Sequence, residues 1–396
     1  MSKIKLLFVI ACLDMGGAEK SLVRLCSKLN SEKYDITILV NSGHKGIISS
    51  QLPDYVKTLY IYRYATLSFN KQYPHYLNKI NDLASKYLFG KCQVKNRFLR
   101  YILRTAAAWE YKKYLQYITD LMAENQYDIS VGFIERDSQV IATHCINAKK
   151  YILFWRHGNV FPFRYDDQAF EKCNIMIALS EKVKEDLVLK KNYDPKKIQV
   201  IHNVYDPENI IRLSDESVKY NKDILNIVSV GRLHPDKGQL DAIKAASILK
   251  QIGVNFNWFF VGLDEGDYAD ECKNAVEKFG LHNKIIFTGV QKNPYNYIKI
   301  ANIYVLPSKY ESLGNTLAEA MILGKPIVST STHGALELIK DGKNGILCGF
   351  APEDIATAIK KVISDENLRN SISSSAKQSA KEFDSEIEKY TELFSC

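Results

Sequence analysis

The segment PSKYESLGNTLAEAMILGKPIV carries the residues whose types and spacing are best suited to chemistry. Its glycine at Gly314 permits a tight turn, and residues 316–323 are predicted to form the helix that follows. Glu311 precedes this helix and Glu319 lies on it, about 7.5 Å beyond Gly314 at a rise of ~1.5 Å per residue. Two carboxylates at this spacing are suited to hold two parts of one extended ligand.

Between the two glutamates, the first backbone N–H groups of the predicted helix form a potential anion site. These N–H groups belong to Leu313, Gly314, Asn315 and Thr316. The alternative interpretation is that Glu311 is a solvated loop charge and Glu319 an exposed helix residue.

A second strand, glycine turn and helix are predicted in VSVGRLHPDKGQLDAI. Arg232 and Lys237 leave the strand end together, which suits a phosphate-bearing ligand, and Gly231 lets backbone approach it. A pair of ordinary surface cations is the alternative. The chain contains no G-x-x-x-x-G-K-[ST] loop and no G-x-G-x-x-G fingerprint, which argues against NTP hydrolysis and NAD chemistry. It also contains no D-x-D metal-binding triplet.

The first half of the chain offers two weaker candidates. Gly16 and Gly17 stand between the first strand and its helix, where they keep side chains out of a cleft, although structural turn glycines have the same pattern. His157 follows the apolar run YILFWR, and a lone histidine there is as readily a hydrogen-bonding residue as a catalytic one.

These residues are positioned by short, continuously apolar runs that alternate with helix-period segments, twice along the chain. The pattern predicts an α/β protein with two doubly wound, parallel-sheet domains. We place the first domain at residues 1–204 and the second at 205–383, with a closing helix at about 384–396 packing back on the first. Ligands of such sheets bind at the carboxyl ends of the strands, where the candidates above lie.

Composition excludes several classes of protein. With 46% hydrophobic and 25% charged residues, the chain is an ordinary globular protein. Its eight cysteines show no C-x-x-C and no zinc-ligand spacing, so we expect neither a disulfide framework nor a metal ribbon, and a reducing cytosol is the simplest location. The apolar start of the chain is short and reads as a buried strand, and no run is long enough to span a bilayer.

Charge is distributed unevenly. Residues 1–205 carry 31 basic and 19 acidic side chains, a net charge of +12, whereas the remainder carries −4. Residues 86–113 contribute +7 of this charge, and aromatic and aliphatic residues interleave with the cations, as in an interfacial helix. The alternative is a solvated cationic face above a core-facing stripe.

Taken together, these segments resemble the retaining glycosyltransferases of family 4, which have the GT-B fold, with two Rossmann-like domains facing across a cleft. The resemblance covers essentially the whole chain. It rests on ESLGNTLAEAM followed by GKPIVS, on GGAE near the start, on RHGN, on VGRL with Lys237 and Gly238, and on FTGV before YIKIANIYVLPS. The sequence departs from the family at His202-Asn203-Val204, where Pro-Asn-Gly is usual, and at Gly262-Leu263-Asp264, where a glycine pair is usual.

The resemblance implies a role for each candidate residue. Arg232 and Lys237 would bind the donor diphosphate, and Glu311 would hold the donor sugar together with the backbone at Gly314 and Asn315. Glu319 would bind the ribose. The backbone around Gly289 and Val290 would meet the base, and His157 and the Gly16-Gly17 turn would complete the site.

The implied function is transfer of a sugar, with retention and without a metal or other cofactor, from a nucleotide sugar to a glycan. UDP-sugar is the expected donor, and the acceptor is expected to be lipid-linked, in cell-surface polysaccharide or glycoconjugate biosynthesis. Residues 86–113 would then bind an anionic membrane surface, on the inner face of the cytoplasmic membrane. Two alternatives remain: a hydrolysing nucleotide-sugar 2-epimerase on a similar scaffold, and a non-enzymatic binder of nucleic acid, for which no recognition motif is present.

Overall fold

A computed structural model describes residues 2–14, 16–61, 97–157 and 166–395, with the backbone alone for residues 97–108, 110 and 166. The chain divides into two compact units by its contacts. Unit 1 comprises Met1–Trp155, Pro162–Ile177 and Phe394–Cys396, and unit 2 comprises Arg156–Phe161 and Ala178–Leu393. Residues 178–204 therefore group with unit 2, whereas the expected division lay at residue 204.

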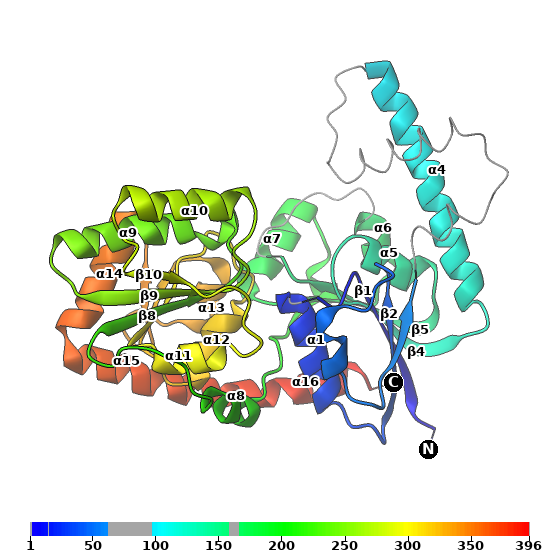
Figure 1. Cartoon of the computed structure of the whole chain (residues 1–396). Coiled ribbons are helices and arrows are strands. Elements are labelled where there is room, and N and C mark those ends of the chain that lie inside the picture. Colours follow the sequence, from blue (N-terminus) through cyan, green and yellow to red (C-terminus); the bar gives the residue numbers. More distant parts are fainter. Residues whose placement is uncertain (1, 15, 62–96, 158–165, 396) are drawn as a thin grey trace. The chain divides into compact units, whose positions relative to one another are not determined.

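Strands and helices alternate along the described residues (Figure 1). Those from the amino terminus to Val200 are β1 (Ile4–Ile10), α1 (Gly17–Lys28), β2 (Tyr34–Val40), η1 (Ile47–Gln51), β3 (Lys57–Tyr60), α4 (Arg97–Met122), β4 (Gln126–Gly132), α5 (Asp137–His144), β5 (Asn147–Trp155), α6 (Asp166–Lys172), β6 (Ile175–Ala178), α7 (Glu181–Lys191), η2 (Pro195–Lys197) and β7 (Ile198–Val200). The remainder are α8 (Pro207–Ser214), β8 (Leu225–Val230), η3 (Pro235–Lys237), α9 (Gln239–Gln251), β9 (Phe256–Val261), α10 (Asp267–Lys278), β10 (Ile285–Phe287), α11 (Tyr295–Ile300), β11 (Ile303–Leu306), α12 (Asn315–Ile322), β12 (Ile327–Thr330), α13 (His333–Leu338), β13 (Ile346–Cys348), α14 (Pro352–Ser364), α15 (Glu366–Ser379), η4 (Ala380–Ser385) and α16 (Glu386–Leu393).

The first sheet has the strand order β3-β2-β1-β4-β5-β6-β7 among the described residues. Its central strands pair in parallel, with Ile4 opposite Tyr34 at one end of the β1–β2 ladder and Ile10 opposite Val40 at the other. Because successive side chains of β1 point to opposite faces, Leu7 packs with α4 and α5 on one face. The next side chain, Phe8, is buried and packs edge-on against Phe133 with ring centroids 5.8 Å apart, so apolar residues contact both sides of β1.

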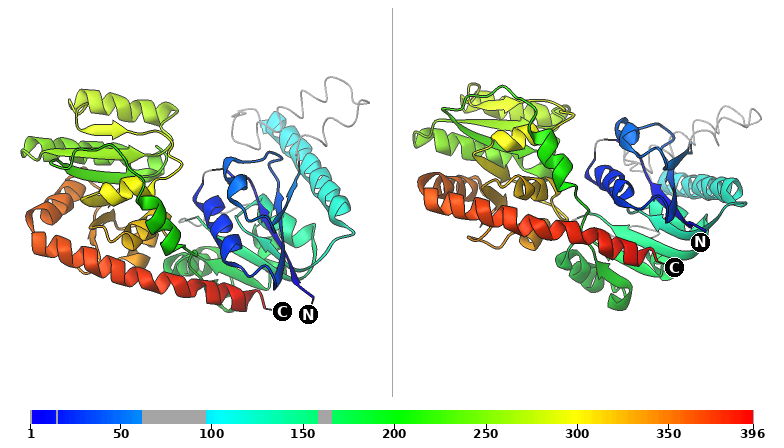
Figure 2. Two further views of the ribbon diagram at one scale, coloured as in Figure 1. Left: turned by 60° about the horizontal axis from the view of Figure 1, so that its bottom comes forward. Right: turned by 90° about the horizontal axis from the view of Figure 1, so that it is seen from below.

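Two features at the end of the chain bear on the expected closing helix. Figure 2 shows α15, η4 and α16 running on from one another as one long rod at the end of the chain. The next residue, Phe394, is fully buried and packs edge-on against Phe8 of β1, with ring centroids 5.8 Å apart. The carboxyl end of the chain is thus part of the unit 1 core.

The second sheet, in unit 2, has the order β10-β9-β8-β11-β12-β13. Helices α9, α10 and α14 share a buried apolar cluster on one face, and α8, α11, α12 and α13 share another on the opposite face (Figure 1). The paired strands are parallel, as in β8–β9 and β11–β12. The prediction of two parallel α/β sheets, each covered on both faces, is confirmed.

Helix α4 covers part of the segment that sequence analysis assigned to a membrane surface. Residues 86–96 of that segment lie outside the described residues, as do the side chains of 97–108. In the part of α4 whose side chains are described, Tyr111, Tyr114 and Ile118 are buried, whereas Trp109 and Tyr117 are exposed. No helix in the described parts of the chain combines the length and apolar character that crossing a bilayer requires.

Candidate active site

The loops that follow β8 and β11 are joined by an ion pair at the carboxyl edge of the second sheet. Lys237 Nζ donates to Glu311 Oε1 at 2.6 Å, and Ser308 Oγ donates to the same oxygen at 2.9 Å. Only 13% of the Glu311 side chain is exposed. Glu311 is therefore a held carboxylate, and its interpretation as a solvated loop charge is wrong.

The same two loops also touch through their backbones. Gly238, which precedes α9, has a φ of +67°, and a Cβ atom at this position would lie 1.9 Å from the carbonyl oxygen of Pro307. Nearby, the backbone N–H of Lys309 donates to the carbonyl of Asp236 at 2.7 Å. This close approach fixes the distance over which Lys237 reaches Glu311, and it requires glycine at position 238.

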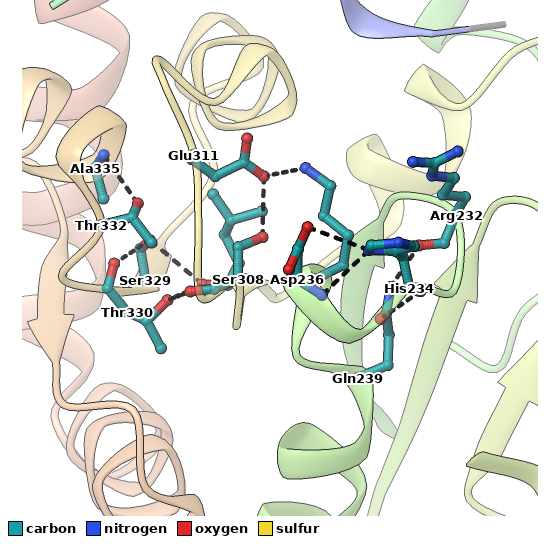
Figure 3. A network of polar contacts seen from close by, with 12 residues as sticks. Arg232, His234, Asp236, Gln239, Ser308, Glu311, Ser329, Thr330, Thr332 and Ala335 are labelled. Atoms are coloured by element: carbon teal, nitrogen blue, oxygen red, sulfur yellow. Dashed lines mark hydrogen bonds and ion pairs between the residues drawn. The ribbon is translucent and has the colours of Figure 1, made fainter. Parts of the chain in front are cut away.

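Arg232 leaves β8 one turn before Lys237. Its backbone carbonyl accepts from Gln239 Nε2 at 3.0 Å, which ties the loop to the first turn of α9. The side chain is exposed, and in Figure 3 the side chains of Arg232 and Glu311 extend toward the same side of the loops. Two cations and one carboxylate therefore gather at one end of β8.

Helix α12 begins directly after Gly314, whose φ of +79° supplies the predicted tight turn. Glu319 is 3% exposed, so its interpretation as an exposed helix residue is also wrong. Burial raises the pKa of the Tyr304 hydroxyl, Thr316 lowers it, and the Glu319 and Glu311 carboxylates raise it further. Both glutamates therefore lie within electrostatic reach of the same buried hydroxyl.

The ends of β9 and β10 complete this edge of the sheet. Gly262 N–H donates to the carbonyl of Gly289 at 3.1 Å, and Gly231 N–H donates to the carbonyl of Val261 at 2.9 Å. Gly289 has a φ of +67°, and the Val290 side chain is 49% exposed. An exposed apolar residue beside open backbone suits contact with a flat ring.

The candidates of the first half lie on separate strand ends of the first sheet. Gly17 begins α1, and Gly16 caps that helix with extended backbone. A Cβ on Gly16 would meet Glu19 Oε2 at 2.0 Å, so the Glu19 carboxylate folds back over the turn. His157 is exposed two residues after β5, and by contacts it belongs to unit 2.

Sequence analysis missed a buried charge cluster around His202, which it noted only as a departure from a motif. His202 Nε2 lies 2.8 Å from Glu337 Oε1, and His202 Nδ1 lies 3.4 Å from Glu386 Oε1. Burial alone would lower the pKa of His202, but the bonds to Glu337 and Glu386 outweigh it and raise this pKa to about 9. The same contact with His202 overcomes burial at Glu386 and lowers its pKa to about 2.

The described residues contain no group of three or more histidine, cysteine, aspartate or glutamate side chains arranged to hold a metal ion. The carboxyl edge of the second sheet carries two cations, Arg232 and Lys237, and a largely buried carboxylate on either side of the start of α12. Such an arrangement is suited to hold a phosphate through Arg232 and Lys237 and hydroxyl groups through Glu311 and Glu319.

The part of the chain that contains this edge is similar to proteins of a known family. Residues 211–379, which include all of it, match the family model described as glycosyl transferases group 1. This part of the chain is therefore similar to the group 1 glycosyltransferases. The chain is 26% identical over 393 residues, covering 96% of this chain and 95% of the relative, to a Campylobacter jejuni GalNAc-alpha-(1->4)-GalNAc-alpha-(1->3)-diNAcBac-PP-undecaprenol alpha-1,4-N-acetyl-D-galactosaminyltransferase.

Other relatives of this chain match over a shorter stretch. An N-acetylgalactosamine-N,N'-diacetylbacillosaminyl-diphospho-undecaprenol 4-alpha-N-acetylgalactosaminyltransferase of the same organism is 30% identical over 217 residues, 54% of this chain. The matched stretch spans 58% of that relative's length, and it spans 56% of an uncharacterized glycosyltransferase from Methanocaldococcus jannaschii.

Solved structures share the whole fold. A glycosyltransferase from Rickettsia africae superposes with a TM-score of 0.72 at 19% identity, covering 100% of this chain and 98% of that one. Anabaena Alr3699/HepE, solved with UDP and glucose, superposes with a TM-score of 0.70 at 18% identity, covering 98% and 99%. The GT-B fold expected from the resemblance is thereby confirmed.

Proposed function

We propose that this chain is a retaining glycosyltransferase, of the family 4 type, that transfers a sugar from a UDP-sugar to a lipid-linked glycan. The observation that carries the proposal is the Lys237–Glu311 ion pair of 2.6 Å, which joins two loops at the carboxyl edge of the second sheet. In this pair, a cation suited to a diphosphate lies against a carboxylate suited to a sugar. A single ligand that carries both a diphosphate and a sugar therefore fits the pair.

The chemistry of sugar transfer fits these residues. Breaking a sugar–phosphate bond develops negative charge on the leaving diphosphate, and Arg232, Lys237 and the amino end of α12 would stabilise that charge. Stabilisation of this kind needs no metal ion, and we include metal independence in the proposal. Glu311 and Glu319 would hold the donor sugar and the ribose, and His157 with the Gly16-Gly17 turn would complete the site.

The choice of substrates rests on the relatives. UDP accompanies the solved Anabaena neighbour, and the printed names of the two Campylobacter relatives specify undecaprenol-linked glycans. By analogy we propose UDP as the nucleotide, a lipid-linked glycan as the acceptor, and cell-surface polysaccharide biosynthesis as the setting.

A lipid-linked acceptor requires contact with a membrane surface, and α4 is the candidate element. Lys113 Nζ lies 3.5 Å from the centre of the exposed Trp109 ring, so a cation and an aromatic side chain are presented together. Together with the charge of residues 86–113, this pairing supports peripheral binding to the inner face of an anionic membrane.

The proposal is tested by a thermal-shift screen of the full chain against UDP-, GDP-, ADP- and CMP-sugars, followed by a transfer assay with the stabilising donor. We expect a UDP-sugar to stabilise the protein and to be consumed only with a polyprenyl-linked acceptor. An α-linked donor should give an α-linked product, and EDTA should leave the rate unchanged. An altered free sugar released without acceptor would instead establish the epimerase reaction.

A further inference from the structure

Two donors hold the Glu311 carboxylate by a single oxygen atom. Lys237 Nζ and Ser308 Oγ both donate to Oε1, at 2.6 and 2.9 Å. A carboxylate oxygen has two lone pairs, so these two bonds use both lone pairs of Oε1. Within the described parts of the chain no donor bonds to Oε2, and in Figure 3 the second Glu311 oxygen points away from Ser308. Oε2 is therefore the oxygen of Glu311 that can accept from a ligand.

The two donors differ in how freely they can turn to another acceptor. Lys237 carries its ammonium group on a flexible four-carbon stem, and 31% of its side chain is exposed. A diphosphate bound at this edge would compete with Glu311 for that ammonium group. Ser308 is fully buried, so its hydroxyl is not available to a ligand and stays with Glu311.

The backbone on both sides of this contact is held by neighbouring elements. Thr330, the last residue of β12, is 1% exposed and donates its hydroxyl to the carbonyl of Ser308. The carbonyl of Glu311 accepts from the backbone N–H of Gly334, in α13, at 3.0 Å. The loop after β11 therefore brings Ser308 and Glu311 together in a geometry that does not depend on Lys237.

We propose that Ser308 is a positioning residue that holds Glu311 Oε1 while Lys237 is engaged with a diphosphate, and so keeps Oε2 directed at the donor sugar. This inference rests on the proposed function, in which Lys237 binds the diphosphate and Glu311 binds the sugar. When the phosphate oxygens draw on the Lys237 ammonium group, the Ser308 hydroxyl is the donor that remains on Oε1. Ser308 acts on the sugar through Glu311 without touching it.

Turnover and nucleotide affinity together test the role of Ser308 in the full chain. With the UDP-sugar selected by the thermal-shift screen, Ser308→Ala should lower kcat about tenfold, the usual scale for a lost hydrogen bond to a charged group. Affinity for UDP alone, measured by calorimetry, should stay within about twofold, because UDP carries no sugar for Glu311 to hold. An unchanged kcat, or an equal loss of UDP affinity, would overturn the proposal.

Ser329→Ala is the matched control for a general loss of structure. Ser329 is also fully buried, but its hydroxyl donates to the backbone carbonyls of Thr330 and Leu306, at 3.0 and 3.4 Å. This variant should lower Tm as Ser308→Ala does, but it should leave kcat within about twofold, because the Glu311 carboxylate keeps both donors. A loss of kcat equal to that of Ser308→Ala would overturn the positioning role.

Thermal unfolding without ligand tests the same contact independently of the proposed function. Lys237→Met removes the ammonium group and leaves Ser308 as the donor to Glu311. Adding Ser308→Ala should then lower Tm by more than the sum of the two single variants, because a largely buried carboxylate loses its last donor. In a Glu311→Ala background the same two losses should add.

The outcomes distinguish the inference from the function on which it rests. Additive losses of Tm with Glu311 present, or the same excess loss without it, would overturn the inference even if the chain transferred sugar from a UDP-sugar. If the excess loss required Glu311 but the wild-type chain bound neither UDP nor a UDP-sugar, the proposed function would fall. The role of Ser308 toward the sugar would fall with it, while its hold on Glu311 would stand.

Discussion

The carboxyl edges of the two sheets differ in how their polar residues are held. In unit 2, Lys237 and Glu311 pair at 2.6 Å with side chains 31% and 13% exposed. In unit 1, the corresponding strand ends of β1 and β2 bring Asp14 and His44 to 3.2 Å, but these side chains are 45% and 56% exposed. The unit 2 pair is therefore desolvated and fixed, whereas the unit 1 pair is a solvated surface contact.

This difference in burial suggests that the two sheet edges of the same architecture serve different purposes. A charge held away from water interacts more strongly with a ligand than a solvated one, and its geometry is set before binding. Under the proposed function, the edge of unit 2 would hold one charged ligand in a single orientation. The exposed side chains at the edge of unit 1 would be able to adjust to an acceptor recognised mainly through hydroxyl groups.

The largest effect is expected on turnover when the Glu311 carboxylate is replaced. Glu311→Gln keeps the side-chain shape but removes the charge that pairs with Lys237, so turnover should fall on the order of 100- to 1,000-fold. UDP affinity should change little, because the proposed partner of Glu311 is the sugar, whereas Glu319→Ala should weaken UDP itself. Steady-state kinetics and calorimetry measure the two quantities.

The matched variant in unit 1 is Asp14→Asn, which breaks the exposed contact with His44. Its effect on turnover should stay below about threefold, the scale of exposed ion pairs. Equal losses at Glu311 and Asp14 would erase the distinction between the two edges.

Alanine substitutions of one glycine at each edge compare the packing of the two edges through the free energy of unfolding. In Gly238→Ala, the new Cβ would lie 1.9 Å from the Pro307 carbonyl oxygen, a main-chain atom that cannot easily move, and residue 238 must keep a φ of +67°. The free energy of unfolding should fall by roughly 3 kcal/mol. Gly16→Ala in unit 1 meets only the flexible end of Glu19, so it should cost less than about 1 kcal/mol. Urea denaturation that ranked the two variants in the opposite order would refute the tight loop packing in unit 2.

The His202 cluster makes the stability of unit 2 depend on pH. His202 has its pKa raised to about 9 from 6.5, so its contribution is fully present below pH 6.5 and is lost as the pH rises through about 9. Glu337 and Glu386, whose pKa values are lowered from 4.5, contribute above pH 4.5, and Lys389 pairs with Glu386 at 2.8 Å. The cluster should stabilise most between about pH 4.5 and 6.5.

Replacing His202 tests whether the cluster stabilises unit 2 in this pH range. His202→Gln should lower the free energy of unfolding by roughly 2 kcal/mol near pH 6, and the deficit should vanish near pH 10. Chemical denaturation at both pH values measures it. A deficit that is the same at both would mean that His202 acts by packing and not by charge.

The smallest effect is expected on the surface of α4. Lys113→Gln removes one unit of charge, so it should weaken binding to anionic liposomes about fivefold, and added salt should weaken it further. Lys284→Gln, in unit 2, is the control and should leave liposome binding unchanged. Equal sedimentation of the wild-type chain with anionic and neutral vesicles would contradict the membrane assignment.

The two sheets and the turn at Gly314 were predictable from the sequence, for a physical reason. Buried parallel strands require continuous apolar runs, and the turn around Gly314 with its flanking glutamates is encoded within a few residues. The Asn203–Asn315 bond spans 112 residues and the His202–Glu386 contact 184, so no local pattern records them. Asn203 and His202 were visible only as a departure from a motif, and their partners emerged from side-chain geometry.

The most direct test of the central claim is calorimetric titration of UDP into the wild-type chain, Arg232→Ala, Lys237→Ala and Lys284→Ala. Lys284 serves as the matched control because it precedes β10, at the amino edge of the same sheet, where its Nζ donates to Asn255. If the carboxyl edge of unit 2 binds the diphosphate, Arg232→Ala and Lys237→Ala should each weaken UDP by about 1 to 3 kcal/mol. Lys284→Ala should match the wild type. Unchanged affinity in both edge variants, or the same loss in all three, would contradict the account.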